Sequence, residues 1–277
     1  MSPEGSRRRR RLLRIGWIGL AALTLLHGVA VLCGIPIAGP FDVVVNLGPT
    51  PVVEGLRVPA DGKRRVVVLQ HGLWRTAASL GRLERTLRAH GYEVWNPGYP
   101  SVRGTIEEHA ELLHRAVESI CAEPVDELSF VGHSMGGLVI QEYLRRSDAR
   151  PATACVYLAT PHRGAVLADL RKHWFLFRLA MGSRAALQLS PGAPIHSRPI
   201  PLPGSSGNLV GDVGEGNSSI PGADDGTVAV GEATFAGARD SLTLPFGHTS
   251  ITFEPEAIVQ VLHFLRHRAF AHDGIQR

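Results

Sequence analysis

The chain has 277 residues, of which 44% are hydrophobic and 19% charged, a composition that excludes a disordered protein and suffices for one large α/β domain. Its net charge of +4 comes from the first 42 residues, which contain six arginines and two acidic residues. The remainder of the chain is electrically balanced, so the basic pI of 9.3 is no argument for nucleic-acid binding, and no nucleic-acid partner is expected.

An apolar segment follows the arginine cluster. Residues 15–38 contain no Asp, Glu, Lys or Arg, and as a helix they would cross a hydrocarbon core of about 30 Å. Because arginines stay on the cytoplasmic side, this pattern predicts a single-pass membrane anchor with residues 1–14 in the cytoplasm and the C-terminal domain outside it. A cleaved signal peptide followed by export is the alternative. Residues 39–62, rich in Pro and Gly, are expected to form a connector.

Strands and helices alternate from residue 63 onward. Predicted strands lie within residues 65–70, 92–100, 128–134, 152–160, 207–212 and 240–245. Predicted helices cover about 77–89, 105–121, 135–147 and 255–270. This alternation indicates an α/β fold with a mostly parallel sheet and helices on both faces. Cys121 and Cys155 are expected to be buried thiols, with a disulfide as the alternative if the domain is exported.

An insertion interrupts this alternation at about residues 161–205 and predicts a small helical cap. Its apolar side chains recur at three- and four-residue steps, which places them on one face of a helix. They are Leu167, Leu170, Trp174, Phe177 and Met181. Two interpretations stay open: a helix packed permanently on the core, or a lid that contributes Trp174, Phe177 and Met181 to acyl-chain binding.

The sequence VGHSMGGL, at residues 131–138, joins a predicted strand to a predicted helix. A serine hydroxyl becomes a strong nucleophile only when it stands clear of the backbone beside a base. Gly132 and Gly136 lie two residues before and after Ser134, which matches the G-x-S-x-G nucleophile elbow. Ser134 is therefore the predicted nucleophile, and His133 is part of the same turn.

Two backbone amides are expected to stabilise the oxyanion of the reaction. One is the N–H of Met135, directly after the nucleophile, and the other is the N–H of Leu73 in the loop that follows the first strand. Gly72 allows that loop to turn inward. His71 precedes it and is interpreted as a residue that organises the loop, since it lies upstream of the serine.

The base and the acid are sought downstream, because the chain order at such an elbow is serine, acid, histidine. His248 follows a predicted strand and is the predicted base. His263 and His267, four residues apart on the last helix, could suggest a metal site, but no third ligand matches them, so no metal is expected. The sequence GADDGTV offers Asp224 and Asp225 as the acid. Asp212 is a further candidate, whose alternative role is to brace its loop.

From about Val66 to Phe270 the sequence resembles the α/β-hydrolase superfamily, and more narrowly its bacterial lipase and esterase branch. The motifs that carry the resemblance are HGLW, GHSMGG, LATPHRGA, DDGTV and GHT, in that order. The resemblance implies a sheet of about eight strands, with the catalytic residues at its carboxyl edge. It also implies Asp225 as the acid, with Asp224 as the alternative, because Asp225 directly precedes Gly-Thr-Val.

These residues predict hydrolysis of a carboxylic ester through an acyl-enzyme, with Ser134, Asp225 and His248 as the triad and no cofactor. The expected partners are a lipid or other ester substrate and the membrane. Acyl transfer or amide cleavage by the same triad remains an alternative. A non-catalytic binding domain is disfavoured, because all three residues are present. The oligomeric state, the acyl-chain length and the head group are left open.

Overall fold

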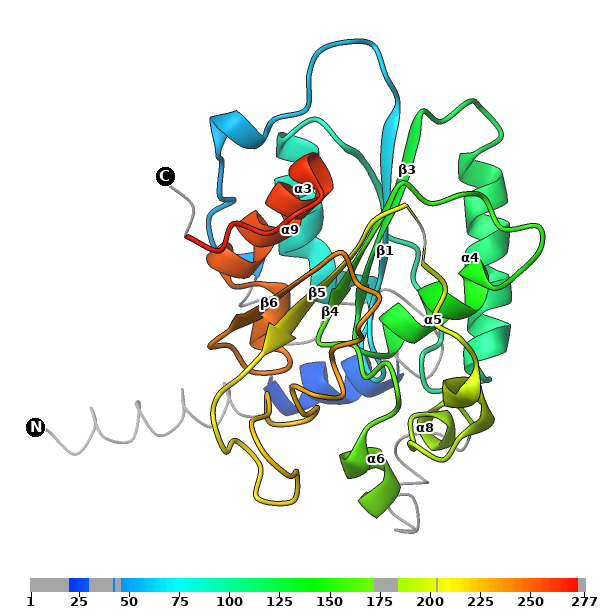
Figure 1. Cartoon of the computed structure of the whole chain (residues 1–277), viewed down its shortest axis with the longest axis vertical. Coiled ribbons are helices and arrows are strands. Elements are labelled where there is room, and N and C mark those ends of the chain that lie inside the picture. Colours follow the sequence, from blue (N-terminus) through cyan, green and yellow to red (C-terminus); the bar gives the residue numbers. More distant parts are fainter. Residues whose placement is uncertain (1–19, 30–41, 43–45, 172–183, 203, 274–277) are drawn as a thin grey trace, which may run out of the picture.

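A computed structural model describes residues 20–29, 42, 46–171, 184–202 and 204–273. Its centre is a six-stranded, all-parallel sheet with the strand order β2-β1-β3-β4-β5-β6 (Figure 1). The strands are β1 (Arg65–Gln70), β2 (Glu93–Trp95), β3 (Glu127–His133), β4 (Ala154–Leu158), β5 (Ser206–Gly211) and β6 (Asp240–Leu244). The predicted α/β class with a parallel sheet is therefore confirmed.

The resemblance implied about eight strands, and the described residues form six. The difference lies partly ahead of β1, where residues 46–64 form turns and the short 3-10 helix η1 (Glu54–Leu56) instead of further strands. The short strand β2 pairs with β1 and is the edge strand on that side of the sheet.

Helices cover both faces of the sheet (Figure 1). Helices α3 (Gly81–Ala89) and α9 (Pro255–His267) lie on one face, and α4 (Ile106–Ile120) and α5 (Met135–Leu144) lie on the other. The side chains of β1 alternate accordingly: Val67 and Leu69 join the core that contains α3 and α9, whereas Val66 and Val68 join the core that contains α4 and α5. A strand buried on both faces is mostly apolar, which explains the apolar residues Val66–Leu69 at the centre of β1.

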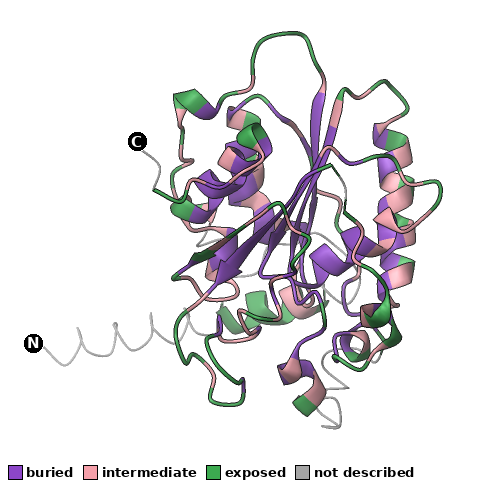
Figure 2. Ribbon diagram, viewed as in Figure 1, coloured by how far each residue is buried: buried purple, intermediate pink, exposed green. Residues whose placement is uncertain are grey.

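Local sequence signals mark the beginnings of helices α4 and α9. Thr105 caps α4 with a capping box, in which its hydroxyl accepts the Glu108 N–H and the Glu108 carboxylate accepts the Thr105 N–H. Pro255 occupies the first turn of α9, where its fixed φ favours the helix. Figure 2 shows that the central strands β1, β3, β4 and β5 are buried, whereas the edge strands β2 and β6 are partly exposed.

The N-terminal prediction needs correction. Residues 20–29 are helical and mostly exposed, and in the described part of the chain no helix combines the length and apolar character needed to cross a membrane. This finding contradicts the predicted single-pass anchor and, with it, the predicted extracytoplasmic placement. The prediction counted charge-free residues, but crossing also requires a continuous helix of about 20 residues. Residues 1–19 and 30–41 lie outside the described residues.

The predicted cap contains α6 (Val166–Arg171), α8 (Ala185–Gln188) and the 3-10 helix η3 (Pro194–Ser197). Leu167 is buried and Leu170 is exposed. The remaining members of the predicted stripe, Trp174, Phe177 and Met181, lie outside the described residues, so their role stays a prediction.

The cysteines do not form the alternative disulfide. Cys155 is buried and Cys121 is half-buried, and both are free thiols.

Candidate active site

Ser134 lies directly after β3, at the carboxyl edge of the sheet, and is followed at once by α5. Its backbone has φ 53° and ψ −127°, a strained conformation for a residue with a side chain. The turn is possible because Gly132 and Gly136, which lack side chains, lie against neighbouring backbone atoms. A Cβ on Gly136 would lie 2.2 Å from the Gln70 carbonyl oxygen, and one on Gly132 would lie 2.6 Å from the Gly137 Cα, so neither position admits a side chain without a shift of the backbone.

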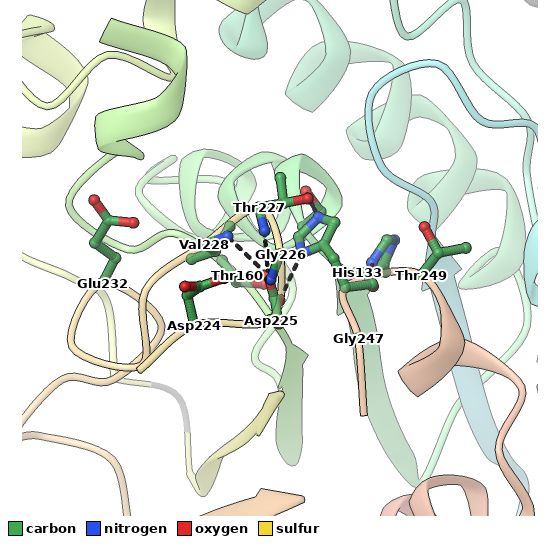
Figure 3. Close-up of polar contacts among 12 residues, drawn as sticks. His133, Thr160, Asp224, Asp225, Gly226, Thr227, Val228, Glu232, Gly247 and Thr249 are labelled. Atoms are coloured by element: carbon green, nitrogen blue, oxygen red, sulfur yellow. Dashed lines mark hydrogen bonds and ion pairs between the residues drawn. The ribbon is translucent and has the colours of Figure 1, made fainter. Parts of the chain in front are cut away.

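Ser134, His248 and Asp225 form a chain of hydrogen bonds. The His248 Nε2 atom lies 3.0 Å from the Ser134 Oγ atom, and its Nδ1 atom lies 2.7 Å from the Asp225 Oδ2 atom. Figure 3 shows the turn that carries Asp225. A carboxylate can only accept, so we assign the imidazole proton to Nδ1. Nε2 is then the acceptor for the serine hydroxyl proton, which is the arrangement that a general base requires.

The turn that follows Asp225 fixes its carboxylate. The Oδ1 atom accepts the N–H groups of Thr227 at 2.9 Å and Val228 at 2.7 Å, and this leaves Oδ2 for His248. The Asp225 carbonyl also accepts the His248 N–H at 2.8 Å. The two segments that carry the acid and the base are therefore joined through both backbone and side chain.

The other two acid candidates face their own loop. Asp224 is fully buried, and its carboxylate accepts the N–H groups of Gly226 at 2.6 Å and Asn217 at 3.2 Å. Asp212 accepts the N–H of Gly214 at 2.7 Å. The Asp224 carboxylate thus braces the turn that carries Asp225, the Asp212 carboxylate braces its own loop, and the structure brings Asp225 to the histidine.

The two amides expected to stabilise the oxyanion lie beside the serine. Met135 is the first residue of α5, and Gly72 packs so closely that a Cβ on it would lie 3.0 Å from the Ser134 Cβ. Neither the Met135 nor the Leu73 N–H has an acceptor among the described residues, which leaves both as donors for a substrate oxygen. Their role in the oxyanion hole stays a prediction.

His71 is fully buried beneath this loop. Its Nδ1–H donates to the Gly72 carbonyl at 3.0 Å, its ring stacks on Tyr99, and the Tyr99 hydroxyl donates to the His71 carbonyl. Burial lowers the pKa of His71 to about 4, so the ring is neutral near pH 7. These contacts organise the loop and do not reach the serine.

His133 makes a contact that the sequence did not indicate. Its Nε2 atom lies 2.8 Å from the His248 carbonyl oxygen and donates to it. Burial, and then the neighbouring His248, hold the pKa of His133 well below its ordinary value, so the ring is a neutral donor. His248 is thereby held at its N–H by Asp225 and at its C=O by His133.

A pocket of about 510 Å³ opens at Ser134 and His248. Its apolar lining comes mainly from the predicted cap and the acid turn, and includes Ala165, Leu167, Ala168, Leu189 and Val228. Trp74, Arg75 and Thr249 add polar groups to the lining, and His27 of the helix at residues 20–29 also lines the pocket. Sequence reasoning gave no role to Trp74 or Arg75, although their position directly after Leu73, the predicted oxyanion donor, was the available signal.

Glu232 connects the acid turn to the cap. Its carboxylate accepts the Ala229 N–H at 2.9 Å with one oxygen and the Val166 N–H, at the start of α6, at 2.7 Å with the other.

The two histidines of the last helix that could suggest a metal site contact protein groups instead. His263 donates to the Ala269 carbonyl and packs against His267. Among the described residues no group of three or more His, Cys, Asp or Glu side chains is placed to hold a metal ion.

The parallel sheet, the strained serine turn and the Ser–His–Asp chain define the class of protein as a hydrolase of the α/β type. The chain belongs to the alpha/beta hydrolase family, whose family model matches residues 66–268.

Solved structures with a similar fold include hydrolases. Lipase BlEst2 of Bacillus licheniformis in its mature form is 19% identical with a TM-score of 0.55, and the match covers 78% of this chain and 95% of that one. Phospholipase PlaB of Legionella pneumophila is 16% identical with a TM-score of 0.60, over 75% and 60% of the two chains. The metagenomic carboxyl esterase MGS0156 is 19% identical with a TM-score of 0.54, over 74% and 68%. At these identities the likeness establishes the fold alone. Among proteins with curated descriptions, none matches the sequence.

Proposed function

We propose that this protein is a serine hydrolase that cleaves carboxylic esters through an acyl-enzyme. The observation that carries the proposal is the continuous hydrogen-bonded chain from the Ser134 hydroxyl through His248 to the Asp225 carboxylate. Its position at the carboxyl edge of a parallel sheet, beside a pocket, is where this fold family carries out its chemistry.

In the first half of the reaction, His248 Nε2 takes the hydroxyl proton while Ser134 Oγ attacks the ester carbonyl. The negative charge that develops on the carbonyl oxygen is stabilised by the N–H groups of Leu73 and Met135. His248 then gives its proton to the alcohol oxygen as the C–O bond breaks. The alcohol leaves, and the acyl group stays bound to Ser134.

In the second half, water replaces the alcohol. His248 takes a proton from the water as it attacks the acyl carbonyl, and then returns that proton to Ser134 Oγ as the acid leaves. Asp225 keeps the imidazole in the Nδ1–H tautomer throughout and stabilises its charged form. The cycle consumes one water for each ester and restores the enzyme.

The pocket supports ester and lipid substrates. Its apolar side, lined by α6 and the acid turn, offers a desolvated surface for an acyl chain. The lipase, esterase and phospholipase among the structures of similar fold agree with this substrate class.

Labelling with a fluorophosphonate tests the proposal directly, because the probe reacts with an activated serine. We expect the wild-type chain and the Ser218→Ala variant to be labelled, since Ser218 is an exposed loop residue. Ser134→Ala should not be labelled, and it should lose hydrolysis of p-nitrophenyl butyrate by about four orders of magnitude or more. Labelling that persists in folded Ser134→Ala would refute the assignment of the nucleophile.

A further inference from the structure

Arg75 places a positive charge in the catalytic pocket. It is half-buried, lines the same pocket as Ser134 and His248, and donates from Nη2 to the Thr249 hydroxyl at 2.8 Å. Among the described residues that line this pocket there is no Asp or Glu. An arginine stays charged at any pH at which the protein is folded, so the pocket presents a permanent cation to its substrate.

Burial removes part of the water around the Arg75 guanidinium. It lowers the pKa of Arg75, and the buried Asp42 carboxylate acts in the opposite direction. In such a partly desolvated place, charge-assisted hydrogen bonds to a bound anion are stronger than in water.

Trp74, directly before Arg75, also lines this pocket and carries a second side-chain donor. Its Nε1–H is buried and has no acceptor among the described residues. A buried donor without an acceptor is unfavourable until a ligand provides one. The backbone of Trp74 also has a φ of 58°, and strain of this kind is concentrated at functional sites. Two consecutive residues therefore offer donors to one ligand.

The position of Arg75 identifies which part of an ester it meets. Its partner Thr249 directly follows His248, the residue that gives its proton to the departing alcohol. The alcohol oxygen must therefore lie beside His248, with the rest of the alcohol on the side of Arg75. Val228, which belongs to the apolar lining, and Thr249 lie on opposite sides of the contacts drawn in Figure 3. The acyl chain is accordingly assigned to the apolar side.

We infer that the pocket binds esters whose alcohol part carries an anionic group, such as a phosphate, and that Arg75 and Trp74 recognise that group. This inference rests on the proposed ester hydrolysis and adds its substrate class. The reaction is the one described above: water and the ester give a free fatty acid and an anionic alcohol, and His248 transfers the proton to the alcohol oxygen.

The test compares three esters of the same acyl length with the full-length chain. The first, 1-octanoylglycerol 3-phosphate, carries its charge on the alcohol; the second, 1-octanoylglycerol, is neutral; the third, 1-(7-carboxyheptanoyl)glycerol, carries its charge on the acyl end. We expect kcat/KM of the wild type to be highest for the phosphate ester, by about ten-fold over the neutral ester, as one charge-assisted hydrogen bond provides. The ester charged on its acyl end should be the poorest, because its carboxylate would enter the apolar side.

Variants connect that preference to the two residues. Arg75→Gln should lower the phosphate-to-neutral ratio of kcat/KM by about ten-fold, and Arg75→Lys should retain part of it. Trp74→Phe, which removes only the N–H, should lower the ratio less. Arg163→Gln is the matched control, because Arg163 is an exposed arginine outside the pocket lining, and the ratio should stay that of the wild type. Taking the ratio removes any general effect of a variant on the triad.

The outcomes separate the two proposals. Hydrolysis of the esters with an unchanged ratio in Arg75→Gln would overturn the inference and leave the proposed function standing. A wild-type preference for the neutral ester, or for the ester charged on its acyl end, would overturn it as well. Failure of the wild type to hydrolyse any of the three, together with absent fluorophosphonate labelling, would refute the proposed function itself.

Discussion

Replacing Asp225 with asparagine tests the triad with a minimal change of shape. The Oδ1 atom would still accept the N–H groups of Thr227 and Val228, so the side chain should keep its orientation. The new NH2 group would then lie where Oδ2 is now, 2.7 Å from His248 Nδ1. Because this group can only donate, Nδ1 must become the acceptor and the imidazole proton must move to Nε2.

The consequence falls on the serine. With its proton on Nε2, the imidazole would donate toward Ser134 Oγ across 3.0 Å and could no longer accept the hydroxyl proton. A wrong tautomer of this kind costs about 10⁴-fold in kcat, equivalent to about 5 kcal/mol in the barrier. The free energy of unfolding should change little, because the two backbone bonds to Oδ1 persist.

The adjacent Asp224→Asn variant is the matched control. Each oxygen of that buried carboxylate accepts a different backbone N–H, from Gly226 and Asn217, and an amide can satisfy only one of them. We therefore expect a loss of about 1–3 kcal/mol of stability and less than about a ten-fold loss of kcat. The assays are kcat on p-nitrophenyl butyrate and the urea midpoint of unfolding. A greater loss of kcat in Asp224→Asn than in Asp225→Asn would refute the assignment of the acid.

Two further predictions concern packing and pH. Gly136→Ala would bring a Cβ to 2.2 Å from the Gln70 carbonyl oxygen, so we expect kcat to fall by about 10²-fold or more and Tm to fall. The control is Gly192→Ala, whose Cβ meets nothing within 4 Å and which should preserve both kcat and Tm. A normal kcat in Gly136→Ala would contradict the geometry of the elbow. Burial lowers the pKa values of His71 and His109 to about 4, so both are neutral in the folded protein but become charged in the unfolded chain below their ordinary value of 6.5. Their contribution to stability is thus fully present above pH 6.5 and is lost as the pH falls toward 4, at about 1.4 kcal/mol for each pKa unit; a urea midpoint that stays constant between pH 7 and pH 4 would exclude it.

Features set by neighbouring residues could be predicted from the sequence. The apolar residues Val66–Leu69 of β1 and the glycines around Ser134 favour a strand and a tight turn, and the structure has the strand and the turn at those residues. His248 also followed from chain order. Choosing Asp225 over Asp224 required the resemblance to a family, because which of two adjacent carboxylates faces the histidine depends on hydrogen bonds to Thr227 and Val228.

Features that arise only from tertiary structure were missed or mistaken. Arg75 follows the oxyanion loop in the sequence, but its bond to Thr249 spans 174 positions, and no local pattern reports such a contact. The same holds for the bond from His133 to the His248 carbonyl. The membrane anchor was predicted from composition alone, and composition does not establish that a single helix continues through the whole apolar segment.

The carboxylate of Glu232 has a consequence for engineering the protein. It accepts a backbone N–H of the first turn of α6 with one oxygen and a backbone N–H of the acid turn with the other. The beginning of the cap and the turn that carries Asp225 are therefore held together by the same side chain. A grafted cap that keeps the backbone N–H of residue 166 in place would retain this contact, whereas one that has proline there or moves the first turn of α6 would lose it. Exchange of caps between related enzymes should therefore succeed or fail according to whether this contact is kept.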